Sequence, residues 1–180
     1  KDFIDAGYSP IFHTSATAST FLYPKSNNNM VRIGIGLYGY YPSKETKEYI
    51  SDKVTLQPIL SWRSIVSEIK EIKKGESIGY NHTWTAGRDT TIAIVPVGYW
   101  HGLKRELSNK GSILLNGSKA PIIGAVSMDM ISIDVTDIPY VRTNDTVTIV
   151  GCSENICRYA GDFEESYSDH SDYELLTTIN

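Results

Sequence analysis

The pattern of hydrophobic and polar residues after Leu56 predicts strands rather than helices, with a period of two at 65–71 and a mostly apolar run at 90–97. The strands are expected at residues 65–71, 90–97, 113–115, from 120 onward and at 146–150. Asn116-Gly117 separates two of these runs and predicts a β-hairpin with a type I′ turn. Several short strands with turn signals between them are typical of a β-barrel or sandwich.

A further strand is expected from Met128 to Val135. A period of two places Ile131, Ile133 and Val135 on one face, which is therefore the core face. Asp129 shares that face, so we expect it at the margin of the core with a hydrogen-bond partner. Met128 then points away from the core, either as a surface methionine or as the lining of a site that another chain completes.

Residues 1–42 have a different pattern. Residues 2–7 look like the end of a helix capped by Gly7. Short strands are expected at 11–14 and 30–35, with a helical segment at 17–22 between them, which suggests a βα unit of a parallel sheet. Thr17 and Gly34 fall where strand gives way to helix or turn, and backbone N–H groups at such places can cradle a phosphate.

Charge and composition exclude several classes of function. The 17 basic and 21 acidic residues give a net charge of −4, and the basic residues at 70–74 are interspersed with glutamates. This balance argues against a nucleic-acid surface. No apolar run reaches the ~18 residues that a membrane span needs.

The four histidines are scattered along the chain, and no paired ligand spacing accompanies the two cysteines, so we assign no metal. Cys152 and Cys157 are expected as free thiols in a reducing cytosol. The chain begins without methionine and stops within an ordered-looking run, and we therefore expect a fragment.

Three glycine-bearing segments occur in a fixed order at 78–80, 97–102 and 124–129. Together with His13-Thr14, Val31 to Ile35 and Leu37-Tyr38-Gly39, they resemble the C-terminal part of the alanine racemases, enzymes dependent on pyridoxal phosphate (PLP). The resemblance spans nearly all of 1–151 and resumes at 173–176. It implies a mixed fold: residues 1–45 would end a TIM-type (β/α)8 barrel, and residues 46–180 would form a mainly-β, barrel-like domain.

The resemblance also implies roles for individual residues. Tyr80 matches the catalytic tyrosine, which removes the Cα proton of one enantiomer, and Arg32 matches the arginine that faces the pyridine nitrogen of PLP. The phosphate contacts match Thr17, Gly34, Ile35 and Tyr173. Met128 and Tyr99 match residues that line the substrate site from the partner subunit of a homodimer. The lysine that holds PLP would lie upstream, so this chain alone is expected to be inactive.

The implied activity is the interconversion of L- and D-alanine for bacterial cell-wall synthesis, in the cytoplasm. Two alternatives stay open: a serine or broad-specificity racemase, and a β-domain binding module without catalysis. This chain also departs from the family. Trp100-His101 stands where Ala-Asp is common, and Ala125 stands where an arginine is frequent. Both departures fall at the expected entrance to the site.

Overall fold

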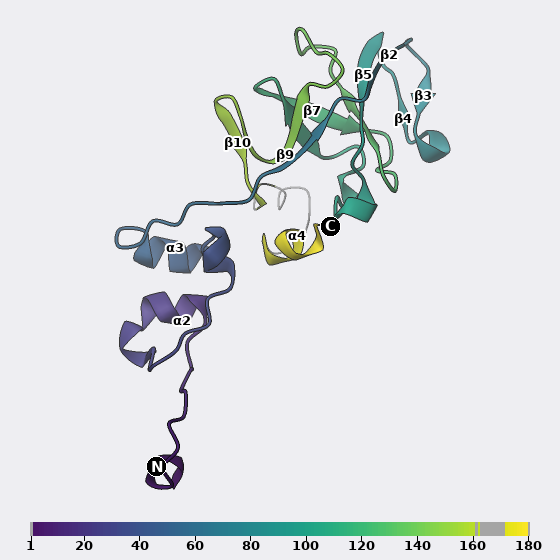
Figure 1. The fold of residues 1–180 in the computed structure, drawn as a ribbon. Coiled ribbons are helices and arrows are strands. Elements are labelled where there is room, and N and C mark those ends of the chain that lie inside the picture. Colours follow the sequence, from purple (N-terminus) through teal and green to yellow (C-terminus); the bar gives the residue numbers. More distant parts are fainter. Residues whose placement is uncertain (1, 161, 163–171, 180) are drawn as a thin grey trace. The chain divides into compact units, whose positions relative to one another are not determined.

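The computed structural model describes residues 2–160, 162 and 172–179. Its contacts divide the chain into two compact units, the first ending at Ile59 and the second beginning at Leu60 (Figure 1). The expected boundary between residues 45 and 46 came from the resemblance and stays a prediction.

Unit 1 is built from short helices. The α-helices are α1 (Asp2–Asp5), α2 (Thr17–Leu22) and α3 (Lys44–Ile50), and the 3₁₀ helices are η1 (Pro24–Ser26) and η2 (Ile35–Tyr38). Helices α2 and α3 pack side by side. The Ser43 hydroxyl caps α3 by accepting a hydrogen bond from the Thr46 amide at 3.2 Å.

Local signals in this unit were predicted well. Helix α2 spans the expected residues, and Gly7 follows α1 with a φ of +84°, as a C-terminal cap requires. The prediction of two strands, at 11–14 and 30–35, is wrong. The described residues there make one parallel bridge, between Ala16 and Arg32, supported by the Arg32 amide bonding the Ser15 carbonyl at 2.9 Å. A strand needs a continuous neighbour to pair with, and this unit supplies only that single contact.

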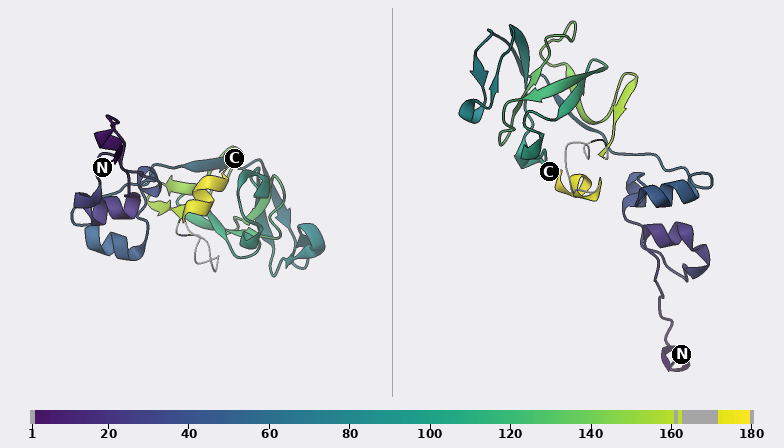
Figure 2. Two further views of the ribbon diagram at one scale, coloured as in Figure 1. Left: turned by 90° about the horizontal axis from the view of Figure 1, so that it is seen from below. Right: turned by 180° about the vertical axis from the view of Figure 1, so that it is seen from behind.

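Unit 2 is mainly β. Within the described residues, one eight-stranded sheet has the order β1-β9-β6-β7-β8-β5-β2, with β10 paired to β9, and every pairing is antiparallel. Its strands are β1 (Trp62–Ile65), β2 (Glu68–Ile72), β5 (Thr90–Val95), β6 (Ser112–Leu115), β7 (Ser118–Ile123), β8 (Ile131–Asp134), β9 (Thr146–Ser153) and β10 (Ile156–Arg158). Only two residues join the end strands β1 and β2, so the sheet must curl until its edges approach, as Figure 2 shows.

The core of unit 2 lies inside this curled sheet. Leu114, Ile133 and Ile149 are fully buried there. The hairpin between β6 and β7 confirms the predicted type I′ turn, because Asn116 and Gly117 have φ values of +47° and +68°. The remaining elements are the pair β3 (Ser77–Ile78) and β4 (Trp84–Thr85), the 3₁₀ helices η3 (Tyr80–His82), η4 (Tyr99–His101) and η5 (Arg105–Leu107), and helix α4 (Asp172–Thr178).

The prediction for Asp129 is wrong. Strand β8 begins only at Ile131, and Ser127 to Met130 form a turn in which the Ser127 amide bonds the Met130 carbonyl at 3.0 Å. The alternation expected from Met128 therefore starts three residues late, and Asp129 is exposed instead of lying at the core margin. Ile131, Ile133 and Val135 are buried, as expected.

The prediction of free thiols is also wrong, because Cys152 and Cys157 form a disulfide. The chain turns at Glu154-Asn155, and the register of β9 with β10 places the two cysteines directly opposite each other. A spacing of five residues fits this hairpin, which the sequence analysis did not predict.

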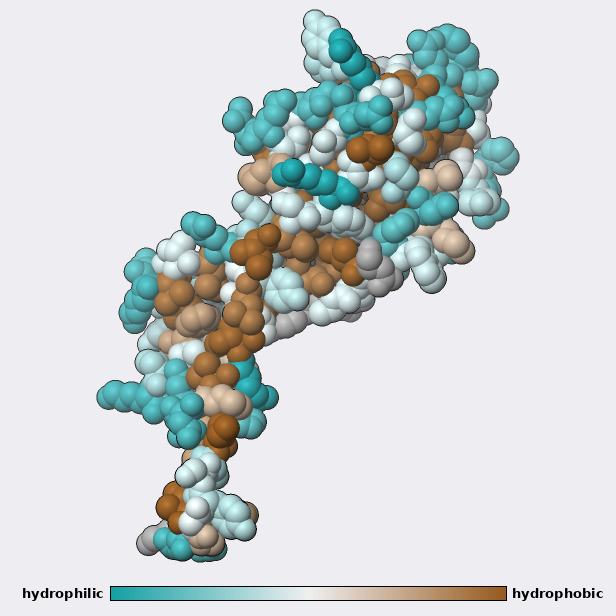
Figure 3. Space-filling view, viewed as in Figure 1, coloured by the Kyte–Doolittle hydropathy of each residue, from teal (hydrophilic) through white to brown (hydrophobic). Residues whose placement is uncertain are grey.

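Within the described residues, no helix combines the length and apolar character of a membrane span. Hydrophobic side chains nevertheless reach the surface of unit 1 (Figure 3). The large exposed ones there include Ile11, Phe12, Leu37 and Tyr38.

Candidate active site

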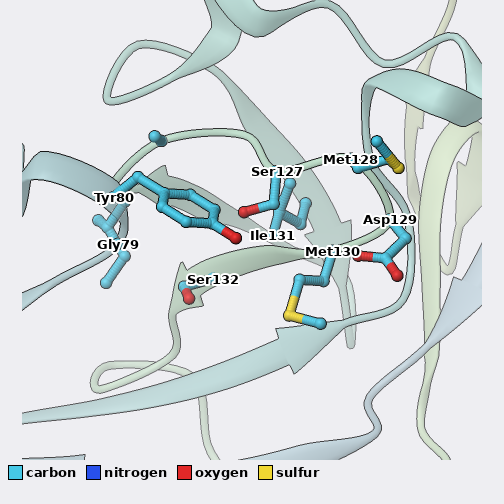
Figure 4. Close-up of a pocket in the computed structure, with 10 residues that line it drawn as sticks. Gly79, Tyr80, Ser127, Met128, Asp129, Met130, Ile131 and Ser132 are labelled. Atoms are coloured by element: carbon cyan, nitrogen blue, oxygen red, sulfur yellow. The ribbon is translucent and has the colours of Figure 1, made fainter.

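A pocket of about 420 Å³ opens in unit 2 between the turn after β3 and the segment that leads into β8. Its lining includes Tyr80, Ser127, Met128, Met130 and Ser132. Figure 4 shows the Tyr80 ring extending from Gly79 into this space, with Ser127, Ser132 and Met130 around its hydroxyl end. Tyr80 and Met128, which are 48 positions apart in the sequence, thus line the same pocket.

Gly79 allows Tyr80 to leave β3 at a sharp angle. Its φ of +76° lies in the region that L-residues avoid, and a Cβ there would lie 3.1 Å from the Ala125 backbone nitrogen. Tyr80 as a whole residue is 71% exposed. Its ring therefore projects from the domain, where a substrate or another chain can reach it.

The pocket wall that faces Tyr80 is held by side chains of the segment after η5, which accept hydrogen bonds from its backbone amides. The Asn109 side-chain oxygen accepts from the Gly124 amide at 2.6 Å, and the Ser108 hydroxyl accepts from the Val126 amide at 3.0 Å. These contacts fix the course of the chain just before Met128, a residue that is 55% exposed.

Tyr99 lies next to this wall but outside the lining of the pocket. Its amide donates to the Ser127 carbonyl at 3.0 Å, and the Trp100 amide donates to the Met128 carbonyl at 2.9 Å. The Tyr99 side chain instead lines a second cavity, of about 470 Å³, which also includes Leu103, Arg105 and Thr178. The Arg105 guanidinium lies 5.6 Å from the centre of the Tyr99 ring, in cation–π range. Sequence reasoning did not single out Arg105.

Unit 1 holds three of the four residues expected to contact a phosphate, namely Thr17, Gly34 and Ile35. The Gly34 amide donates to Thr17 Oγ1 at 2.9 Å, and Ile35 follows at the start of η2. Thr17 is buried, with 3% of its surface exposed. Among the described residues, its hydroxyl hydrogen has no acceptor, so this buried donor is available to an anion. The arrangement fits a phosphate group at this point.

The structure gives less detail for Arg32 and Tyr173, the two other residues expected to contact the cofactor. Arg32 is exposed, and its backbone makes the parallel bridge to Ala16. Tyr173 lies in α4, and the position of its side chain is outside the described part of the chain. Thr17, Arg32, Gly34 and Ile35 thus lie in unit 1. In unit 2 the structure brings Tyr80 and Met128 together in one pocket, whereas Tyr99 lines the second cavity.

Sequence reasoning missed three polar or flexible residues in the pocket: Ser127, Met130 and Ser132. They lie within four residues of Met128, and the period of two places Met130 and Ser132 on the same face as Met128, so the sequence held a signal for them. Asp129 also lines the pocket, although it was expected at the core margin.

The resolved shifts in pKa lie outside the pocket. Hydrogen bonds from the Lys73 side chain and the Lys74 amide lower the pKa of Asp89, and Arg88 lowers the pKa of Asp137 in the same way. Within the described residues, no group of three or more His, Cys, Asp or Glu side chains could hold a metal ion.

Comparison with known families gives two matches along the chain. The family described as "Alanine racemase, C-terminal domain" matches residues 59–180, and the family described as "Alanine racemase, N-terminal domain" matches residues 2–42.

Individual relatives agree with these matches. An alanine racemase of Leptospira interrogans is 40% identical over 179 residues, which cover 97% of this chain and 46% of the relative. The crystal structure of alanine racemase from Bacillus anthracis with bound L-Ala-P superposes with a TM-score of 0.87 at 34% identity, covering 99% of this chain and 45% of that one. The crystal structure of alanine racemase from Bartonella henselae with covalently bound pyridoxal phosphate superposes with a TM-score of 0.81 at 27% identity, and the match covers 99% of this chain and 47% of that one. The chain therefore spans about half the length of the relatives it matches.

Proposed function

This chain belongs to the alanine racemase family, and from that membership we propose that the full-length protein interconverts L- and D-alanine with PLP as its cofactor. The observation that carries the proposal is the shared pocket of Tyr80 and Met128, because it places a phenol hydroxyl at an open site beside a flexible apolar wall. The names of the relatives supply the substrate and the reaction.

The cofactor proposal rests on unit 1. The buried Thr17 hydroxyl would bind the phosphate of PLP at the corner that Thr17 forms with Gly34 and Ile35, and Arg32 would face the ring of the cofactor. When bound, PLP supplies the electron sink that makes the Cα proton of an amino acid removable. Arginine stays protonated at physiological pH, so Arg32 would present a permanent positive charge to the ring nitrogen.

We assign Tyr80 the movement of one proton. Its phenol oxygen would exchange a proton with Cα of alanine on one face, and a lysine outside this chain would act on the other face. A group that does this must come within hydrogen-bond reach of the reacting atom. The high exposure of Tyr80 suits a site that is completed from outside its own domain.

The wider biology is part of the same proposal. Unit 1 would be the end of a TIM-type barrel, which the parallel bridge between Ala16 and Arg32 supports. The protein would be a homodimer in which Tyr80, Tyr99 and Met128 serve the cofactor of the partner subunit. It would act in the cytoplasm and supply D-alanine for the cell wall.

The test is racemisation by the full-length protein loaded with PLP. Wild-type protein should interconvert L- and D-alanine, and Tyr80→Phe should slow racemisation about 10²–10⁴-fold in both directions, because the phenol removes the Cα proton in one direction and returns it in the other. Tyr140→Phe is the matched control, since Tyr140 is 87% exposed and lies outside the pocket lining. Preference for serine over alanine would favour the broader racemase, and absence of any racemisation would favour a non-catalytic module.

A further inference from the structure

A tight turn supports the wall of the pocket that contains Met128. The turn begins at Gly98 and continues through η4 to Gly102, whose φ is +98°. The Gly98 carbonyl accepts from the His101 amide at 3.0 Å and from the Leu103 amide at 3.2 Å. These bonds close the turn onto the Gly98 carbonyl at its start.

The same turn is packed directly on the pocket wall. A Cβ on Gly98 would lie 2.2 Å from the Ser127 carbonyl oxygen and 2.6 Å from the Met128 carbonyl carbon. The amides of Tyr99 and Trp100 then donate to the Ser127 and Met128 carbonyls. Any shift of Gly98 would therefore move the backbone of Met128 and of Tyr99 together.

One side chain fixes Gly98 from within the turn. His101 Nδ1 accepts a hydrogen bond from the Gly98 amide at 3.2 Å, as the third residue of a capping box does for the residue at the N-cap. An acceptor is needed here because the Gly98 amide has no other acceptor among the described residues, and an unpaired backbone donor that is shielded from water costs free energy. The accepting atom Nδ1 of histidine is bonded to Cγ. Aspartate and asparagine have an acceptor oxygen, Oδ1, bonded to Cγ in the same way, so either residue could accept the Gly98 bond at this position.

We propose that His101 is a positioning residue for the substrate site: its imidazole holds Gly98, and through Gly98 it sets the placement of the Met128 wall and of Tyr99. The inference that this matters for the substrate rests on the proposed function. The assignment of His101 as the side chain that holds Gly98 does not rest on the proposed function, because it follows from the contacts of the turn. His101 is not one of the residues that line the pocket, so we assign it an effect through the backbone of Gly98.

The first experiment measures amide hydrogen exchange at Gly98 in the full-length protein with selectively labelled glycine. His101→Leu keeps a branched side chain of similar reach but removes the acceptor, whereas His101→Asn keeps an acceptor at the δ1 position. Exchange at Gly98 should become about tenfold faster in the leucine variant, which corresponds to about 1.4 kcal/mol, and stay near the wild-type rate in the asparagine variant. The Gly75 amide, which bonds the Ala86 carbonyl at 2.8 Å, is the internal reference for global folding.

The second experiment separates a positioning role from a merely structural one. In the racemisation assay, His101→Leu should raise KM about three- to tenfold with little change in kcat, because a displaced wall weakens substrate binding without touching the reacting atoms. His101→Asn should restore the wild-type KM.

Equal Gly98 exchange in wild type and His101→Leu, or asparagine failing like leucine in both measurements, would overturn the proposal. A faster Gly98 exchange with an unchanged KM would also overturn it, since the wall would then not depend on the turn. If the full-length protein lacks racemase activity altogether, the proposed function fails while the exchange measurement still decides whether His101 holds Gly98.

Discussion

The Gly34 amide donates a hydrogen bond to the Thr17 hydroxyl over 2.9 Å, although 17 positions of sequence separate the two residues. This contact ties the start of α2 to the start of η2, directly after the parallel bridge between Ala16 and Arg32. It gives unit 1 a defined corner in which a buried hydroxyl and backbone amides lie together.

Replacing Thr17 should therefore weaken cofactor binding. Thr17→Val keeps the shape of the side chain but removes the hydroxyl, so the Kd for PLP in the full-length protein should rise about tenfold. Thr17→Ser keeps the hydroxyl and is the control that should bind nearly as wild type. Equilibrium dialysis of the cofactor measures both, and equal Kd values for the valine and serine variants would contradict the phosphate assignment.

Gly98→Ala should be costly, and Gly87→Ala should not. A Cβ on Gly98 would meet backbone atoms of Ser127 and Met128, which cannot move as a flexible side chain can, whereas a Cβ on Gly87 has nothing within 4 Å. Overpacking of this kind costs about 1–3 kcal/mol in the free energy of unfolding. Urea unfolding of the two full-length variants checks the difference, and similar midpoints would show that the 98–103 turn is not packed as described.

The disulfide between Cys152 and Cys157 should add modest stability. Its loop is short, so replacing both cysteines by serine should lower the free energy of unfolding by about 2 kcal/mol at most. Reduction of the wild type should reproduce the effect of the double variant. Titration of thiols in the denatured, unreduced protein is the direct check, and two free thiols would refute the pairing.

The ion pair between Lys73 and Asp89 should be visible in the titration of the carboxylate. The Lys73 side chain lies 2.9 Å from the carboxylate and lowers the pKa of Asp89. A lowered pKa in the folded state means that this contribution to stability is present above the ordinary carboxyl pKa and is lost as pH falls through the folded value. NMR titration should show the Asp89 pKa rising in Lys73→Gln and unchanged in Lys70→Gln, because Lys70 pairs with Glu68 instead.

Sharing of sites between subunits is testable by mixing two inactive full-length variants. One is Tyr80→Phe, and the other lacks the lysine that holds PLP. If each site takes its tyrosine from the partner subunit, a heterodimer has one intact site, and random exchange should restore about a quarter of wild-type activity. Verified heterodimers without activity would show that Tyr80 serves its own subunit.

The sequence by itself determined the features that depend on near neighbours. The Asn116-Gly117 turn needs two residues that tolerate positive φ, and helix α2 and the Gly7 cap depend on signals within one or two turns of chain. The ordered motifs likewise identified the family, which the matches to both of its domains confirm.

The tertiary structure decided what depends on distant partners. Asp129 was misplaced because the Ser127 and Met128 carbonyls accept from the amides of Tyr99 and Trp100, in a turn that delays the start of β8, and no alternation in the local sequence reveals that contact. The cysteine pair required the register of β9 with β10. Gly98 looked like any glycine beside a tyrosine until the backbone of Met128 was found against it. Such contacts arise from packing between segments far apart in the chain, so their energies are set by the fold as a whole and not by the residues nearby.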